Sequence, residues 1–215
     1  MTNNNKRVAL QADKKEQLNA VLESLKEAML EANESGDAEL SAALQETLDQ
    51  VANQAADCFA VVLDQCTIEL QNAGGTIIST PPIFSRVIND PFSLECCISP
   101  TTVDAVTECG ILPDAATVNE VRATGPLNYY LTFDLNTYFN DGNQGCADQD
   151  VRPFVCTGST CVDEVLCYTP LDEVDACPDF CNGAVFSFAV RCSLCEFGDK
   201  ITATYVIVHL LPNCN

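Results

Sequence analysis

Two long runs near the C-terminal end show the clearest pattern of apolar and polar positions. Residues 184–194 alternate, so that apolar side chains and Cys192 share one face while Ser187 lies on the other. Residues 201–211 are apolar on both faces towards their end, which favours a central place in a sheet. A polar turn at 197–200 separates the runs. The pattern predicts a long antiparallel hairpin whose first strand has one buried and one wet face.

A different period marks residues 1–57. Leucine and alanine recur there at spacings of three and four, which places an apolar stripe on two helices, at about 12–34 and 38–57. Between them, Gly36 can end the first helix and Asp37 can cap the second. We expect a helical hairpin, with one bent helix as the alternative. The stripe must pack on its own domain or on another subunit, and the sequence favours neither.

Many short β-like runs, separated by Gly, Pro and Asn, follow this helical segment. The expected strands are 58–70, 76–79, 83–88, 93–98, 103–109, two within 118–139 that separate near Gly125-Pro126, 151–156 and 161–168. The fold class expected is α+β: an N-terminal helical hairpin in a helical module of residues 1–57, then a mainly antiparallel β-sandwich or jelly-roll-like domain of residues 58–215.

The charge of the chain restricts its partners. Thirty-one Asp and Glu against ten Lys and Arg give a formal charge of −21 at pH 7. We expect no nucleic-acid partner and no membrane partner, because both anionic surfaces need a basic face. No apolar window has the length of a membrane span. The first residues also lack the apolar run of a secretory signal, so we expect none.

The fourteen cysteines bear most on function, because so high a cysteine content is typical of disulfide-linked proteins. Cys96 and Cys97 are adjacent, so their side chains point to opposite faces of a strand, and one can face a neighbouring subunit. Cys58 and Cys66 flank the first expected strand, and Cys214 lies on a tail that could reach another chain. Bridges within and between chains both remain open. The fourteen candidates are Cys58, Cys66, Cys96, Cys97, Cys109, Cys146, Cys156, Cys161, Cys167, Cys177, Cys181, Cys192, Cys195 and Cys214.

Four of these cysteines have a spacing near that of a zinc ribbon. Cys177-x3-Cys181 and Cys192-x2-Cys195 could supply four thiolates for tetrahedral zinc. Two features oppose this interpretation: alternation sends Cys192 to the core, and only Arg191 lies close enough in sequence to favour thiolates. Zinc is therefore the alternative to disulfides, and we expect no other cofactor.

Catalytic patterns are nearly absent. The only histidine, His209, stands between Val208 and Leu210, where a packed side chain is expected rather than a general base. Nucleophile-elbow, phosphate-loop and dinucleotide motifs do not occur. The C-x-x-C pattern at residues 192–195 lacks the βαβ context of redox enzymes. We therefore expect no enzymatic activity.

Together these features resemble the cysteine-rich self-assembling proteins on the spores of endospore-forming bacteria, namely exosporium, outer-coat and appendage subunits. The shared features are an N terminus without an export signal, a β-rich cysteine-dense region over about 58–215, the Cys96-Cys97 doublet and Cys214 near the C terminus. The resemblance implies a subunit made in the mother-cell cytoplasm without a signal peptide, and then assembled on the spore surface with other copies and other spore-surface proteins. Lysis of the mother cell would expose it to an oxidising exterior.

Three functions are open from the sequence. The first is a structural protein that self-assembles into a surface layer or filament stabilised by disulfides. The second is a zinc-binding module built on Cys177, Cys181, Cys192 and Cys195. The third is an extracellular adhesin or toxin-like binding protein with intrachain disulfides only.

Overall fold

The structure is a computed structural model in which antiparallel strands predominate. It describes residues 19, 21–23, 25–30, 32–34, 36–54, 60–71, 76–107, 110–139, 149–173, 175–180, 185–198, 200–212 and 214. The α+β class and the mainly antiparallel sheet expected from the sequence are confirmed. The helical hairpin and the jelly-roll arrangement stay predictions.

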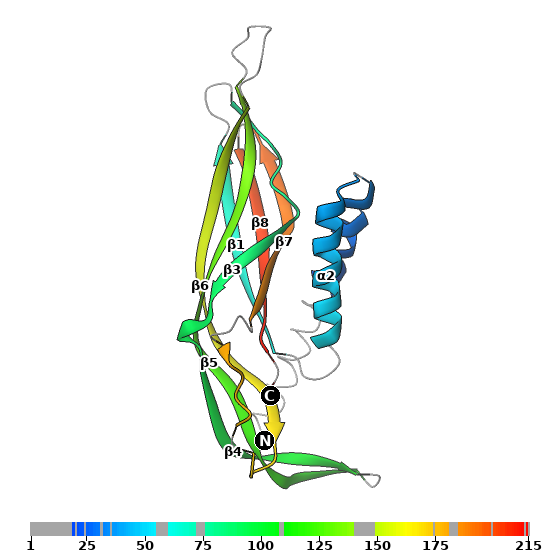
Figure 1. The fold of residues 1–215 in the computed structure, drawn as a ribbon, viewed down its shortest axis with the longest axis vertical. Helices are drawn as coiled ribbons and strands as arrows, with labels where there is room; N and C mark the ends of the chain where they lie inside the picture. The colour runs from blue at the N-terminus through cyan, green and yellow to red at the C-terminus, as the bar shows by residue number, and fades with distance from the viewer. Residues whose placement is uncertain are drawn as a thin grey trace.

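Eight strands in the described part of the chain form one antiparallel sheet (Figure 1). Along the sheet the order is β1-β8-β7-β3-β5-β2, and β4 and β6 also pair with β5. The strands are β1 (Val61–Gln71), β2 (Thr76–Ile78), β3 (Phe84–Asp90), β4 (Glu95–Thr107), β5 (Gly110–Phe139), β6 (Gln149–Thr169), β7 (Phe186–Phe197) and β8 (Lys200–Leu210).

Strand β3 divides this sheet into two facing layers. Its residues Phe84–Arg86 pair with β7, whereas Val87–Asp90 pair with β5. Layer A therefore contains β1, β8, β7 and the start of β3, and layer B contains the rest of β3 with β5, β2, β4 and β6. The inward side chains of both layers form a shared core that includes Leu131, Tyr205 and Ile207. Because β3 crosses from one layer to the other, the sheet curls until it is nearly closed.

The gap in this closure lies between β1 and β6, for which no strand pairing is recorded among the described residues. A disulfide between Cys66 and Cys156 crosses it, joining residues 90 positions apart. Nearby, the Tyr129 hydroxyl donates a hydrogen bond of 2.9 Å to Asp64 Oδ2. Covalent and polar side-chain contacts thus connect the two layers where a backbone ladder is missing. Cys66 does not flank a strand as expected; it is buried in the middle of β1.

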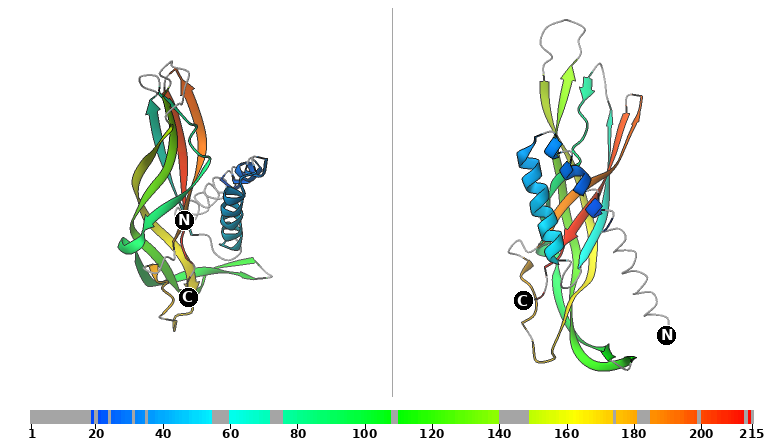
Figure 2. Two further views of the ribbon diagram at one scale, coloured as in Figure 1. Left: turned by 45° about the horizontal axis from the view of Figure 1, so that its top comes forward. Right: turned by 90° about the vertical axis from the view of Figure 1, so that its right-hand side faces the viewer.

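Helical residues cover the outer face of layer A (Figures 1 and 2). Residues 19, 21–23, 25–30 and 32–34 are helical, and α2 (Ala38–Gln54) follows a turn. Gly36 at this turn has φ +72°, and Asp37 Oδ1 accepts the Leu40 N–H at 3.0 Å as a helix cap. Leu25, Leu44 and Val51 belong to one buried cluster with Phe188, Val208 and Leu210 of layer A. The apolar stripe therefore packs on its own domain.

This cover explains why one prediction about β7 is wrong. Ser187, expected to be wet, is buried, and Ala189 on the same side packs in the core between the layers. Phe188 and Val190 point to the opposite side, beneath the helices. Both faces of the first half of β7 are thus covered, one by layer B and one by helix. The central position predicted for the second strand of the hairpin is confirmed, since β8 lies between β1 and β7.

The strand breaks expected at Gly125-Pro126 and within residues 93–109 and 151–168 are also wrong. β4, β5 and β6 each run through without interruption. The Gly-Pro pair lies where β5 stops pairing with β4, at Thr124, and starts pairing with β3, at Asn128. The 3-10 turn Pro91–Ser93 connects β3 to β4 at this corner, while β6 pairs with β5 across the whole stretch.

Substitution of Gly125 tests this corner. The residue has φ +124°, and a Cβ on it would collide with the Ser93 carbonyl oxygen. We expect Gly125→Ala to lower the free energy of unfolding by about 2–4 kcal/mol, because backbone strain and a backbone clash add. Gly198→Ala is the matched control: φ is +63° with open space around the Cβ, so about 1 kcal/mol is expected. Urea denaturation measures both, and equal losses would contradict this account of the corner.

Removal of the disulfide across the gap gives a second test. The double variant Cys66→Ala/Cys156→Ala should lose about 2–5 kcal/mol of stability, since it releases a long loop in the unfolded chain and leaves a cavity in the core. Cys97→Ser, at an exposed free thiol, should change stability by less than about 0.5 kcal/mol. Thermal denaturation under non-reducing conditions compares the two variants.

Candidate functional site

The structure separates the described cysteines into two groups. Three intrachain disulfides join Cys66 to Cys156, Cys96 to Cys177 and Cys167 to Cys214. Four cysteines are free and exposed: Cys97, Cys161, Cys192 and Cys195. The remaining candidates, Cys58, Cys109, Cys146 and Cys181, lie outside the described residues. The free thiols form the candidate functional site, because an exposed thiol can react with a partner outside the molecule.

The adjacent pair Cys96 and Cys97 behaves as strand geometry predicts. Cys96 points inward and is bonded to Cys177, whereas Cys97 points outward and is free. The inner bond holds the acidic segment after β6 against the domain. Asn119 Nδ2 supports the same segment by donating to the carbonyl oxygens of Pro170, Leu171 and Glu173 at 3.2–3.4 Å.

Two proposals for individual cysteines need correction. Cys214 does not project on a reaching tail, because its sulfur is bonded to Cys167 at the end of β6. Cys192 is not directed into the core, because the register of β7 against β8 shifts between Arg191 and Ser193. Cys192 is the extra residue of this bulge and is exposed, with its thiol donating to the Thr204 carbonyl oxygen at 3.3 Å.

The four proposed zinc ligands do not come together as thiolates in this structure. The Cys177 sulfur is bonded to Cys96, and Cys181 is outside the described residues. Cys192 and Cys195 lie on the exposed end of β7. Within the described ranges, no group of three or more His, Cys, Asp or Glu side chains could hold a metal ion. Zinc at the proposed set would therefore require reduction of the Cys96–Cys177 bond.

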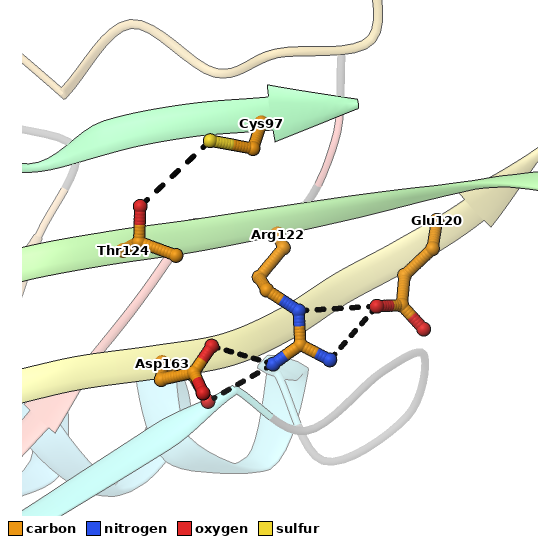
Figure 3. A network of polar contacts seen from close by, with 5 residues as sticks. All are labelled: Cys97, Glu120, Arg122, Thr124 and Asp163. Atoms are coloured by element: carbon orange, nitrogen blue, oxygen red, sulfur yellow. Dashed lines mark hydrogen bonds and ion pairs between the residues drawn. The ribbon is translucent and has the colours of Figure 1, made fainter. Parts of the chain in front are cut away.

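Cys97 lies beside a network of charged side chains on the outer face of layer B (Figure 3). Its sulfur is 3.8 Å from Thr124 Oγ1. Arg122 donates to Glu120 Oε1 at 2.8 and 3.0 Å and to Asp163 Oδ1 at 2.6 Å. Desolvation opposes the charge on Arg122, but these two carboxylates outweigh it and raise its pKa. The guanidinium is thus matched within the chain, which argues against an anion-binding role for this face.

The free thiols cannot bridge one another without movement of the backbone. Cys97 pairs with Arg122 on one side of β5, and Cys161 pairs with Pro126 on the other. Four residues along β5 separate these positions by about 13 Å, whereas a disulfide needs Cα atoms within about 7 Å. Cys192 and Cys195 are three residues apart on one strand, roughly 8–10 Å even with the bulge. Among the described cysteines, each free thiol is therefore available to another molecule rather than to a second free thiol of its own chain.

A polar cluster that sequence patterns do not reveal is buried between the layers. His209 is fully buried, and its Nδ1 shares a 2.7 Å hydrogen bond with Ser187 Oγ. Asn89 Nδ2 donates to the same hydroxyl at 2.7 Å, and the Tyr129 ring lies 5.2 Å from the imidazole. The members come from β3, β5, β7 and β8, so only the three-dimensional fold brings them together. A Ser-His pair enclosed in this way cannot contact a substrate in this conformation and has a structural role, as expected for a packed histidine.

Comparisons with protein-family models, with curated proteins and with solved structures find no match for this chain. In the described part of the chain, no helix has both the length and the apolar character that crossing a membrane requires. Any function must therefore be inferred from the site itself.

The burial of His209 predicts a pH dependence of stability. Desolvation lowers its pKa to about 4, against a smaller opposing effect of the Asp64 carboxylate. Because the unfolded chain takes up the proton first, His209 should remove about 3 kcal/mol of stability as pH falls from about 6.5 to 4, with no effect above that window. The stability of His209→Gln relative to the parent should rise by this amount between pH 7 and 4 in urea titrations. A constant difference between the two proteins would contradict the prediction.

Proposed function

We propose that this protein is a structural subunit that self-assembles and is held in its assembly by disulfides between copies. The observation that carries the proposal is the separation of the cysteines: the inward ones are bonded within the chain, and the described outward ones are free and exposed. A domain of this size has its own core and does not need every cysteine for folding. Outward thiols that cannot reach each other are suited to bonds between molecules.

The placement of these thiols also favours an extended assembly over a closed pair. Cys97 and Cys161 lie on layer B, while Cys192 and Cys195 lie at the end of β7 in layer A. A subunit with reactive groups on two layers can be joined to more than one neighbour at once. Contacts at more than one surface, whether twofold or head-to-tail, extend the assembly into a sheet or filament rather than ending it at a dimer.

Electrostatics supports a covalent link. A subunit with formal charge −21 repels its copies, so weak contacts alone hold an assembly poorly at low ionic strength. A disulfide is unaffected by salt and persists wherever the surroundings are oxidising. In this proposal dissolved oxygen is the oxidant: four thiols reduce one O2, giving two disulfides and two waters.

The spore surface is the location that we propose, on the basis of the sequence resemblance. Synthesis in the mother-cell cytoplasm followed by lysis would supply the oxidising exterior. Other copies of the chain, and other spore-surface proteins, would be its partners, and no enzymatic activity is part of the proposal. We further propose that the helical residues form a hairpin over about 12–57 that covers layer A, and that the strands of residues 58–215 belong to a sandwich-like or jelly-roll-like domain.

Electrophoresis with and without reductant tests the cross-linking. The oxidised protein should form a ladder that reductant collapses to one band. A quadruple variant with Ser at positions 97, 161, 192 and 195 should lose most of that ladder, while its circular dichroism and thermal midpoint stay near those of the parent because the three internal bonds remain.

Electrophoresis, together with zinc analysis, also separates the alternative functions. A monomeric parent after oxidation would favour the adhesin or toxin-like protein with internal bonds only. Zinc bound by the reduced protein at about one ion per chain, measured by elemental analysis, would favour the metal-binding module. A full ladder in the quadruple variant would contradict the role assigned to the four exposed thiols.

A further inference from the structure

The outward face of layer B contains a two-strand region without charge. Pairs in register across β5 and β6 present only neutral side chains, and Ile88 of β3 lies opposite Tyr130. Tyr130, Val155 and Ile88 are 46%, 59% and 62% exposed. This uncharged panel consists of Pro126, Asn128, Tyr130 and Thr132 of β5, of Cys161, Ser159, Thr157 and Val155 of β6, and of Ile88.

The panel is unusual because acidic residues surround it. Asp163 lies beyond Cys161 at one end, Asp134 beyond Thr132 at the other, and Asp90 beside Asn128. Six residue steps make the panel about 20 Å long. The centre of its β6 side is therefore about 10 Å or more from the carboxylates at the two ends, which exceeds the Debye length of about 8 Å in physiological salt, whereas Asp90 borders the panel on the β3 side, away from β6. The helices pack on layer A, so they do not cover this face.

A second copy of the chain is the occupant that these charges favour. Two acidic subunits that approach through charged faces place carboxylates opposite carboxylates, which costs several kcal/mol at protein interfaces. Along β6 the panel brings neutral side chains together instead, and burial of Val155 stabilises the contact. The free thiol of Cys161 lies within this same surface.

We propose that two copies meet through the β6 side of the uncharged panel and that Cys161 bonds to Cys161 of the second copy. This inference rests on the proposed function and names one of its contacts. A twofold axis along β6 would place each β6 residue opposite its own equivalent. Two of the neighbours of Cys161, Pro126 and Ser159, are small. The third, Asp163, is paired with Arg122 at 2.6 Å, which offsets its charge where it lies near its own equivalent. Backbones can therefore approach more closely there than the usual 10 Å or so between facing sheets, as a disulfide requires.

The covalent step is an oxidation of two thiols. Each Cys161 loses one proton and one electron, and one sulfur–sulfur bond forms. Dissolved oxygen accepts the electrons, with four thiols consumed for each O2 and two waters released. The noncovalent contact comes first and raises the local concentration of one thiol near the other.

A pair of single variants tests the assignment of Cys161. After oxidation in air, Cys161→Ser should reduce the intensity of the covalent dimer band about tenfold, because the thiol that links the two copies is absent. Cys97→Ser, at another exposed thiol of layer B, should leave that dimer and reduce only larger species. Mass spectrometry of unreduced peptides should identify a Cys161–Cys161 link in the parent. Absence of that link, or an unchanged dimer in Cys161→Ser, would overturn the inference.

A second pair tests the panel without relying on the thiol. In reduced protein, Thr157→Asp places two carboxylates across the axis, and sedimentation should show self-association weakened by about tenfold or more, with partial recovery in high salt. Ser193→Asp adds the same charge at an exposed position of β7 and should leave association unchanged. Equal effects of both variants would overturn the panel as the contact.

The two levels of the proposal fail separately. A ladder that survives Cys161→Ser but disappears in the quadruple variant removes this contact and retains disulfide-linked assembly. A parent chain that stays monomeric after oxidation removes both.

Discussion

The burial of layer A on both of its faces is the constraint on which the rest of the structure depends. Phe188, Val208 and Leu210 need the helices above them, while Tyr205 and Ile207 need layer B below. Among the described residues, nothing packs on the outer side of the helices or of layer B, so both outer surfaces face solvent there. Burial of the apolar side chains in these two clusters is the main favourable contribution to the stability of such a domain. The three-layer order thus decides which side chains remain available for contact with other molecules.

Local sequence patterns predicted most elements of this fold. They failed where a second layer covers a strand face expected to meet solvent, or where a new partner strand continues the pairing. The hairpin of β7 and β8, the cap at Asp37 and the opposite faces of Cys96 and Cys97 follow from short-range geometry. Ser187 was expected to be wet because a polar residue in an alternating strand usually is, yet it is buried as part of the hydrogen-bonded cluster around His209. Gly125-Pro126 suggested a break because sequence alone does not show that a different strand continues the pairing on each side.

Cysteine chemistry could be predicted only in part for the same reason. Composition indicated disulfides, but the partners are 47 to 90 residues apart and depend on the packing of β1, β4 and β6. The exposure of Cys192 results from a bulge of one residue that reverses the expected side. The uncharged panel is likewise invisible in the linear sequence, because β5 and β6 contribute to it in opposite directions and the acidic residues that limit it come from three strands.

The crossing of β3 between the layers has a mechanical consequence. If neighbours pull on thiols of layer A and of layer B, the force passes through covalent junctions that the described layers share. These are the strand β3, the Cys66–Cys156 bond from β1 to β6, and the Cys167–Cys214 bond from β6 to the segment after β8. In β5 and β6 the long register places many backbone hydrogen bonds side by side, perpendicular to tension along the strands, so they resist together rather than one after another. Such a subunit would open first where β3 passes from one layer to the other, and the two disulfides would keep the layers attached after that.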